Sequence, residues 1–144
     1  MLVAQILSLK SDDTVATVLP STSIEKAAQL LAQKRIGTLI ISRDDHAADG
    51  IVSERDIVRQ IGQAGAACLG APVRDIMTTK LVTCTRDMRA DEVLARMTEG
   101  RFRHMPVVED GALVGLISLG DVVKARLTEL AMEKDALEGM IRGH

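Results

Sequence analysis

The chain repeats its own pattern after 65 or 66 residues, and this internal repeat limits the possible folds more than any other feature. Leu39 and Met105 lie 66 residues apart, and the segments Gly50–Asp56 (GIVSERD) and Gly115–Asp121 (GLISLGD) lie 65 apart, because one residue is missing from the second hairpin turn. Apolar positions match apolar positions across the repeat, so the two halves should fold alike. Half of a 144-residue chain buries too little surface to be stable alone, and we expect the halves to share a core.

Each half predicts the element order β-α-β-β-α. The run 21–37 is typical of a helix, with a cap among Ser21–Ser23 and Gly37 as its end. The expected fold class is α/β (α+β), two β-α-β-β-α repeats packed through their sheets with pseudo-twofold symmetry. The other predicted elements are strands over 15–19, 38–42, 50–52, 81–84, 103–108 and 113–117, and helices from 54, over 89–98 and from 119.

These elements predict four regions: a first domain over 10–66, a linker over 67–80, a second domain over 81–130 and a helical tail over 131–144. The small residues of Ala64–Gly70 favour a linker. Residues 2–9 predict a short helix or a strap, 10–14 a polar turn, and the stretch from Pro72 through Met77 a short turn of helix.

Composition excludes several classes of protein. Net charge is −2, and the chain has one Phe and no Trp or Tyr, which argues against a constitutive nucleic-acid binder. The chain has 47% hydrophobic and 26% charged residues but no apolar run near the ~20 residues of a membrane span, and no basic leader, so we expect a cytoplasmic protein. The isolated thiols of Cys68 and Cys84 indicate neither a disulfide framework nor a metal site.

Both repeats contain a corner where a strand should pass into a helix. Ser53 and Ser118 can each accept a hydrogen bond from a first-turn backbone N–H, with Asp56 or Asp121 at the third helical position. Such a corner collects unpaired N–H groups and the positive end of the helix dipole, which suits an anion or a hydroxyl-rich ligand. The alternative is that both serines and both aspartates only cap helices.

The chain resembles a tandem pair of CBS domains, the adenosine-sensing Bateman module, over about 10–130. The resemblance rests on the element order, on Met77 and Thr78 of VRDIMT, on FRHMPVV at Phe102–Val108, and on both corners. It implies a regulatory protein that binds AMP, ADP, ATP, S-adenosylmethionine or a dinucleotide such as NAD in clefts between the domains. It further implies a regulatory part and not a catalyst. The sequence shows no metal-ligand constellation, so we expect no catalytic cofactor and no metal, and the regulated partner should be another protein chain.

The resemblance also implies the ligand-binding residues. Asp121 and Asp56 would accept the two hydroxyl donors of a ribose, with Ser118 and Ser53 on sugar or phosphate. The remaining candidates of the Asp121 cleft are Ser11, Ala16, Ile36, Gly37, Arg103 and His104, and those of the Asp56 cleft are Arg55, Met77, Thr78, Val82 and Phe102. Two further candidates are Lys10, for phosphate, and Thr38, which is the counterpart of His104 in the first repeat. Arg103 and His104 would bind phosphate. The small side chain of Ala16 limits stacking on adenine.

Two further hypotheses come from other classes of protein. A structural dimerisation module with empty clefts would keep the capping serines, and a nucleic-acid effector would conflict with the charge balance. The sequence contains neither a nucleophile with a paired base nor a phosphate-binding glycine loop, so it offers no candidate site for an enzyme. The tail carries an apolar stripe, Leu127, Leu130, Leu137 and Ile141, which predicts a homodimer; the alternative is that the tail folds back on its own domain.

Overall fold

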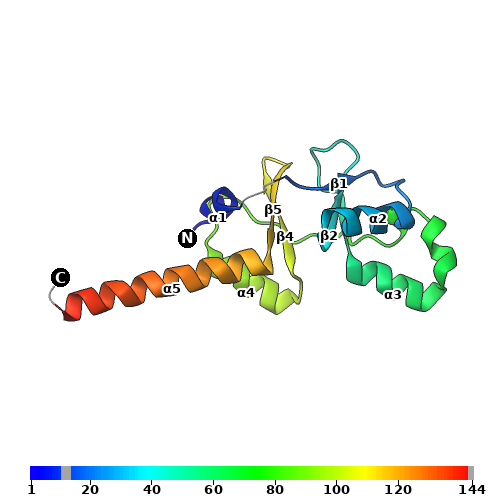
Figure 1. Ribbon diagram of the computed structural model, residues 1–144. Helices are drawn as coiled ribbons and strands as arrows, with labels where there is room; N and C mark the ends of the chain where they lie inside the picture. The colour runs from blue at the N-terminus through cyan, green and yellow to red at the C-terminus, as the bar shows by residue number, and fades with distance from the viewer. Residues whose placement is uncertain (11–13, 143–144) are drawn as a thin grey trace. The chain divides into compact units, whose positions relative to one another are not determined.

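Short runs of β-branched residues in the first half form a three-stranded sheet in the order β1-β2-β3. β1 (Thr17–Val18) pairs in parallel with β2 (Thr38–Ile41), and β2 pairs antiparallel with β3 (Gly50–Ser53). Parallel neighbours need a crossover, which α2 (Ile24–Lys34) supplies, and α3 (Glu54–Ala64) follows β3 without a break (Figure 1). β2 is buried along its whole length, so it forms the centre of this sheet.

The core beneath this sheet is aliphatic. Ile24, Ala27 and Leu31 recur at helical spacing on α2 and are buried against the sheet. The rest of the buried cluster comes from the strands, α3 and the segment after it: Val18, Leu39, Ile41, Val52, Ile57 and Val73. The helix face that the apolar spacing predicts is therefore the face that the structure buries.

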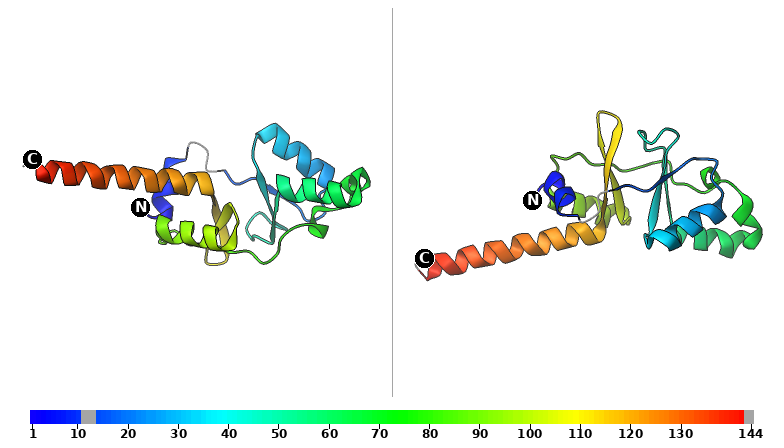
Figure 2. Two further views of the ribbon diagram at one scale, coloured as in Figure 1. Left: turned by 90° about the horizontal axis from the view of Figure 1, so that it is seen from below. Right: turned by 45° about the horizontal axis from the view of Figure 1, so that its top comes forward.

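The second half contains a two-stranded sheet, β4 (His104–Glu109) and β5 (Ala112–Ser118). It is flanked by α1 (Val3–Leu9), α4 (Ala90–Gly100) and the long α5 (Leu119–Ile141), which continues past α4 and α1 in both views of Figure 2. The mixed α/β class is confirmed. The core of this part consists of Val3, Ile6, Cys84, Ala90, Val93, Met97, Met105, Val107, Ile117, Val122 and Ala125.

The strand predicted over 81–84 is wrong. Only Cys84 makes a bridge, parallel to Val107, at the position equivalent to the pairing of Val18 with Ile41 in the first repeat. Val82 and Thr83 are exposed and Cys84 is buried, so a single side chain anchors this segment and no ladder extends from it.

The prediction that Gly37 ends the first helix is also wrong. α2 ends at Lys34, and Arg35 follows in the left-handed conformation with φ of 53°. Arg101, 66 residues later, takes the same conformation after α4, with φ of 57°. In each repeat the chain must reverse at once to enter the next strand, and a left-handed residue makes that reversal even when it is not glycine.

The segment predicted as a linker folds onto the first repeat. It forms two short 3₁₀ helices, η1 (Ala66–Gly70) and η2 (Val73–Asp75), and buries Cys68 and Val73. η1 packs against α2 and α3, and Thr78 bridges to Ile51 of β3. A side-chain carbon at Gly50 would lie 2.5 Å from Sδ of Met77, so the glycine admits this segment. Gly115 plays the same part for α1, because a carbon there would lie 3.0 Å from the Leu7 side chain.

The segment before each repeat therefore packs on the other repeat. The structure, a computed structural model, describes residues 1–10 and 14–142 and divides into two units. Unit 1 comprises Met1–Asp13, Thr83–Val107 and Gly115–His144, and unit 2 comprises Thr14–Val82 and Val108–Val114. The boundaries 10–66, 67–80, 81–130 and 131–144 stay predictions about the repeats. Over the described ranges, no helix has both the length and the apolar character needed to span a membrane.

Candidate functional site

Both predicted corners are reciprocal capping boxes. In unit 2, Asp56 donates its N–H to Oγ of Ser53 at 3.2 Å, and Ser53 donates its N–H to Oδ2 of Asp56 at 2.8 Å. In unit 1, the corresponding bonds between Asp121 and Ser118 are 3.1 and 2.9 Å. The capping roles of the two serines are confirmed, and both carboxylates are held in fixed positions at a helix N-terminus.

Lys10 reaches the unit 1 corner from the end of α1. Its ammonium lies 3.0 Å from Oδ2 of Asp121 and donates to the backbone oxygen of Leu116 at 2.9 Å. Both side chains of the ion pair are about one quarter exposed, so water screens them only partly. Sequence reasoning proposed Lys10 as a phosphate ligand and did not predict that it would pair with Asp121.

The surroundings of Asp121 keep its carboxyl ionised. Partial burial raises the pKa of this group, but the Ser118 N–H and the nearby Lys10 ammonium lower it by more, so that the pKa lies below the ordinary value of 3.8. At neutral pH the corner therefore presents a carboxylate, which accepts hydrogen bonds and donates none.

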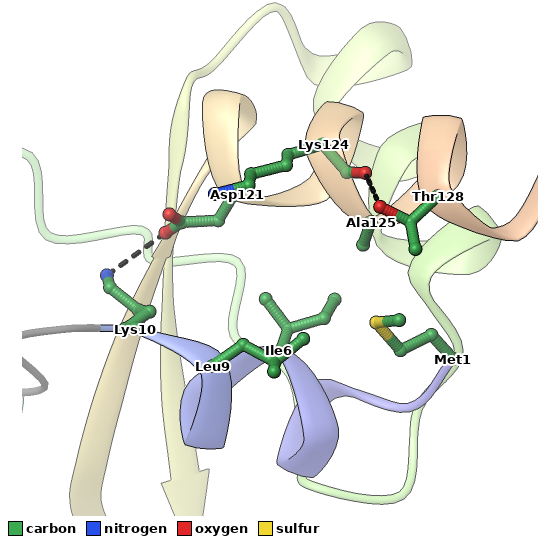
Figure 3. Close-up of a pocket in the computed structure, with 8 residues that line it drawn as sticks. All are labelled: Met1, Ile6, Leu9, Lys10, Asp121, Lys124, Ala125 and Thr128. Atoms are coloured by element: carbon green, nitrogen blue, oxygen red, sulfur yellow. Dashed lines mark hydrogen bonds and ion pairs between the residues drawn. The ribbon is translucent and has the colours of Figure 1, made fainter.

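A cavity of about 310 Å³ opens beside this ion pair, between α1 and α5 (Figure 3). Ile6 and Leu9 line one wall from α1, and Lys124 and Thr128 line the other from α5. Its complete lining is Met1, Ile6, Leu9, Lys10, Asp121, Lys124, Ala125 and Thr128. The cavity combines an apolar wall, two ammonium groups and a carboxylate, which suits a ligand with hydroxyl and anionic groups.

Lys124 and Thr128 were absent from the sequence prediction. They follow Asp121 by three and seven residues, a spacing that places all three on one side of a helix. That periodicity was the available signal.

The predicted basic pair borders the same corner. The backbone oxygen of Arg103 accepts the N–H of Leu119, the first residue of α5, at 2.7 Å. The Arg103 side chain is exposed and forms no ion pair with the described residues, whereas His104 is half-buried at the start of β4. Arg103 can therefore turn toward an anion at the corner without first breaking an ion pair within the described chain.

The unit 2 corner has a different set of neighbours. Thr78 exchanges two backbone hydrogen bonds with Ile51, of 2.9 and 3.0 Å, and Met77 covers Gly50, so the predicted Met77 and Thr78 lie along the strand that leads to Ser53. No lysine pairs with Asp56 in the described chain. Its ion-pair partner is Arg59, whose guanidinium lies 3.6 Å from the carboxylate and whose side chain is more exposed than that of Lys10.

Gly37 and Thr38 also adjoin this unit 2 corner. Thr38 is the ladder partner of Ser53, and the oxygen of Gly37 accepts the N–H of Glu54 at 3.0 Å. The cross-repeat assignment of Gly37 to Asp121 and the ligand role of Thr38 stay predictions.

The other predicted ligand residues are distributed between the units. Ala16 and Ile36 are half-buried in unit 2, where Arg55 and Val82 are exposed, and Phe102 packs beside Gly100 in unit 1. Ser11 lies outside the described residues. Among the residues that the structure describes, no three His, Cys, Asp or Glu side chains gather as metal ligands would.

Comparison with known proteins gives a consistent family assignment. The family model described as CBS domain matches residues 4–63 and 73–128. The chain is 34% identical over 125 residues to a mitochondrial CBS domain-containing protein of Arabidopsis thaliana, covering 84% of this chain and 61% of that protein. It therefore spans less than two thirds of that relative.

Solved structures of similar sequence share the fold. A CBS-domain protein of Agrobacterium tumefaciens is 41% identical, with a TM-score of 0.82 over 88% of this chain and 99% of that one. A CBS domain protein of Pyrobaculum aerophilum complexed with AMP is 26% identical, with a TM-score of 0.77 over 92% and 99% of the two chains. The CBS domain pair of protein MJ0100, in complex with 5-methylthioadenosine and S-adenosyl-L-methionine, is 25% identical, with a TM-score of 0.78 over 90% and 98%.

Proposed function

Because this chain belongs to the CBS domain family, we propose that it is a regulatory module which binds an adenosine-containing ligand and passes the signal to another protein. The ligand class is that of AMP, ADP, ATP, S-adenosylmethionine or NAD. The relatives solved with AMP and with S-adenosyl-L-methionine support this class. On this proposal the chain regulates a partner protein and performs no chemistry of its own.

The ionised Asp121 beside Lys10 is the observation on which the proposal depends. The Ser118 N–H and the Lys10 ammonium both contact Oδ2, and we assign Oδ1 to the ribose. Two adjacent ribose hydroxyls can donate together to one carboxylate. Once the ribose hydroxyls donate hydrogen bonds to the Asp121 carboxylate, the Lys10 ammonium can turn toward a phosphate or a carboxylate of the same ligand.

The alternative is a structural module without a ligand. The capping boxes are compatible with it, because capping alone accounts for the positions of Asp56 and Asp121. Capping does not require Lys10 or the cavity beside Asp121, so these two features distinguish the hypotheses.

Thermal unfolding with a panel of ligands tests the proposal. The panel is AMP, ADP, ATP, S-adenosylmethionine, 5-methylthioadenosine and NAD, with GMP as a control for phosphate and ribose without adenine. A ligand at 100 times its Kd stabilises the folded state by ~2.7 kcal/mol. For a chain of 144 residues this corresponds to a rise in Tm of roughly 5 to 10 °C.

Asp121→Asn preserves the shape of the corner and removes the charge, so it should abolish most of that rise. If no adenosine compound raised Tm above the GMP control, the structural module would be the better description.

A further inference from the structure

α5 carries five large apolar side chains on one exposed face. Together with Lys134 they follow one another at intervals of four, three, four, three and four residues: Val123, Leu127, Leu130, Lys134, Leu137 and Ile141, which we call the α5 stripe. An alternation of three and four gives a period of about 3.5, the period with which one helix packs along another. The exposed fractions of the apolar members range from 40% at Val123 to 85% at Ile141.

Unit 1 does not cover the α5 stripe. α5 packs into the unit through a different face, which buries Val122 and Ala125 and brings Glu129 within 2.8 Å of the Met1 amino group. From 131 to 137 every residue of the helix is exposed, and Figure 2 shows α5 continuing beyond α1 and α4. The tail therefore does not fold back on unit 1, and an apolar stripe of this length needs a partner outside it.

We propose that the partner is α5 of a second copy of this chain, running antiparallel. The two helices are aligned so that position 132 of one copy lies level with position 132 of the other. In that register Val123 packs against Ile141 of the second copy, Leu127 against Leu137, and Leu130 against the aliphatic stem of Lys134. Each contact occurs twice by symmetry, so the stripe of each copy is matched along its whole length. The stripe spans about 27 Å at 1.5 Å per residue, enough for a paired helix.

Charges beside the stripe select the antiparallel direction. On one flank, Lys124 of each copy faces Glu138 of the other copy across the antiparallel pair, which gives two attractive contacts. Glu133 meets Glu133 of the second copy at the centre of the other flank, which is one repulsive contact. In a parallel pair, Glu133 would face Glu138 twice and Lys134 would meet Lys134 in the interface, with no attractive contact in return.

Light scattering on the full chain across a hundredfold range of concentration tests whether the stripe is the interface. The wild-type chain should reach twice its 15.5 kDa mass. Leu130→Glu should raise the dissociation constant of the dimer at least a hundredfold, because it places a charge in the interface. Met132→Glu is the matched control, since Met132 is 64% exposed, equally apolar and off the stripe, and it should leave the dimer intact.

A charge exchange tests the direction. Lys124→Glu alone should weaken the dimer about tenfold, but the same change in a Glu138→Lys background should strengthen it, because opposite charges then face each other again. Glu138→Lys also breaks the contact of Glu138 with Lys134 in its own helix, 3.9 Å apart. That loss is the same in both proteins of the Glu138→Lys background, so it does not affect the comparison.

A wild-type chain that stays monomeric, or a Leu130→Glu chain that stays dimeric, would overturn the proposed interface. Lys124→Glu that weakened the dimer in both backgrounds would overturn the antiparallel direction. All of these measurements use ligand-free protein, so they fail or succeed independently of adenosine binding.

Discussion

The ammonium of Lys10, at the end of α1, lies 3.0 Å from the carboxylate of Asp121 in the first turn of α5. The contact links the segment before the first repeat to the corner of the second. It keeps Asp121 charged and fastens α1 beside the cavity, so one ion pair connects the folding of unit 1 with the site proposed for the ligand.

Lys10→Met should lower the free energy of unfolding by about 1 kcal/mol, because it removes a partly buried ion pair and the hydrogen bond to Leu116. Urea unfolding measures the change. Arg43→Met is the matched control, because Arg43 pairs with Asp49 through a side chain that is 70% exposed, and its loss should cost less than half as much. Equal effects of the two substitutions would show that the Lys10 contact has no special role in stability.

The contribution of the Asp121 charge should depend on pH in a defined direction. Its pKa is lower in the folded than in the unfolded chain, so the stabilisation is complete above the ordinary value of 3.8 and is lost as pH falls through the folded pKa. The difference in unfolding free energy between wild type and Asp121→Asn should therefore be constant from about pH 7 to about pH 5 and shrink toward about pH 3. In a Lys10→Met background this pH dependence should be smaller. A difference that grew on acidification would contradict the assigned direction of the pKa shift.

The two corners should bind nucleotide phosphate unequally. Arg103 and Lys10 adjoin the Asp121 corner, whereas Gly37, the counterpart of Arg103 in the first repeat, has no charge. Asp121→Ala and Arg103→Ala should each weaken AMP binding at least about tenfold in calorimetry, as expected for the loss of a charge-assisted hydrogen bond, while Asp56→Ala should spare the tighter site. If Asp56→Ala abolished tight binding and Asp121→Ala did not, the phosphate preference would belong to the other corner.

Arg35→Gly should raise the free energy of unfolding by about 0.5 kcal/mol. Arg35 holds φ at 53°, where a side chain is strained and glycine is not, although glycine loses more backbone entropy on folding. Arg35→Ala is the control, because it removes the same side chain atoms beyond Cβ but keeps the strain, and it should give no gain. Chemical denaturation of the three proteins compares them directly.

Much of the fold was predictable because the two halves of the chain carry the same sequence pattern. The repeat, the helical spacing of Ile24, Ala27 and Leu31, and the Ser-x-x-Asp corners are all local patterns, and each produced the expected element. Helices and caps of this kind depend on hydrogen bonds and apolar spacing among residues a few positions apart, so a single sequence is enough to predict them.

Other features depended on contacts between residues that are distant in sequence. Whether 81–84 forms a strand depends on how much of it is buried, and the tertiary structure buries only Cys84. Arg35 takes the place expected for Gly37 because the direction of the following strand requires an immediate reversal.

The pairing of Lys10 with Asp121 had no signal in the sequence either. It arises because α1 packs beside α5, and only the packing of unit 1 brings a side chain from the start of the chain to a carboxylate near its end. The sequence by itself determined the repeated elements and their capped corners, because those depend on neighbouring residues. The partner of each charge and the open face of α5 were decided by tertiary packing, because burial and electrostatic pairing belong to the folded surface as a whole.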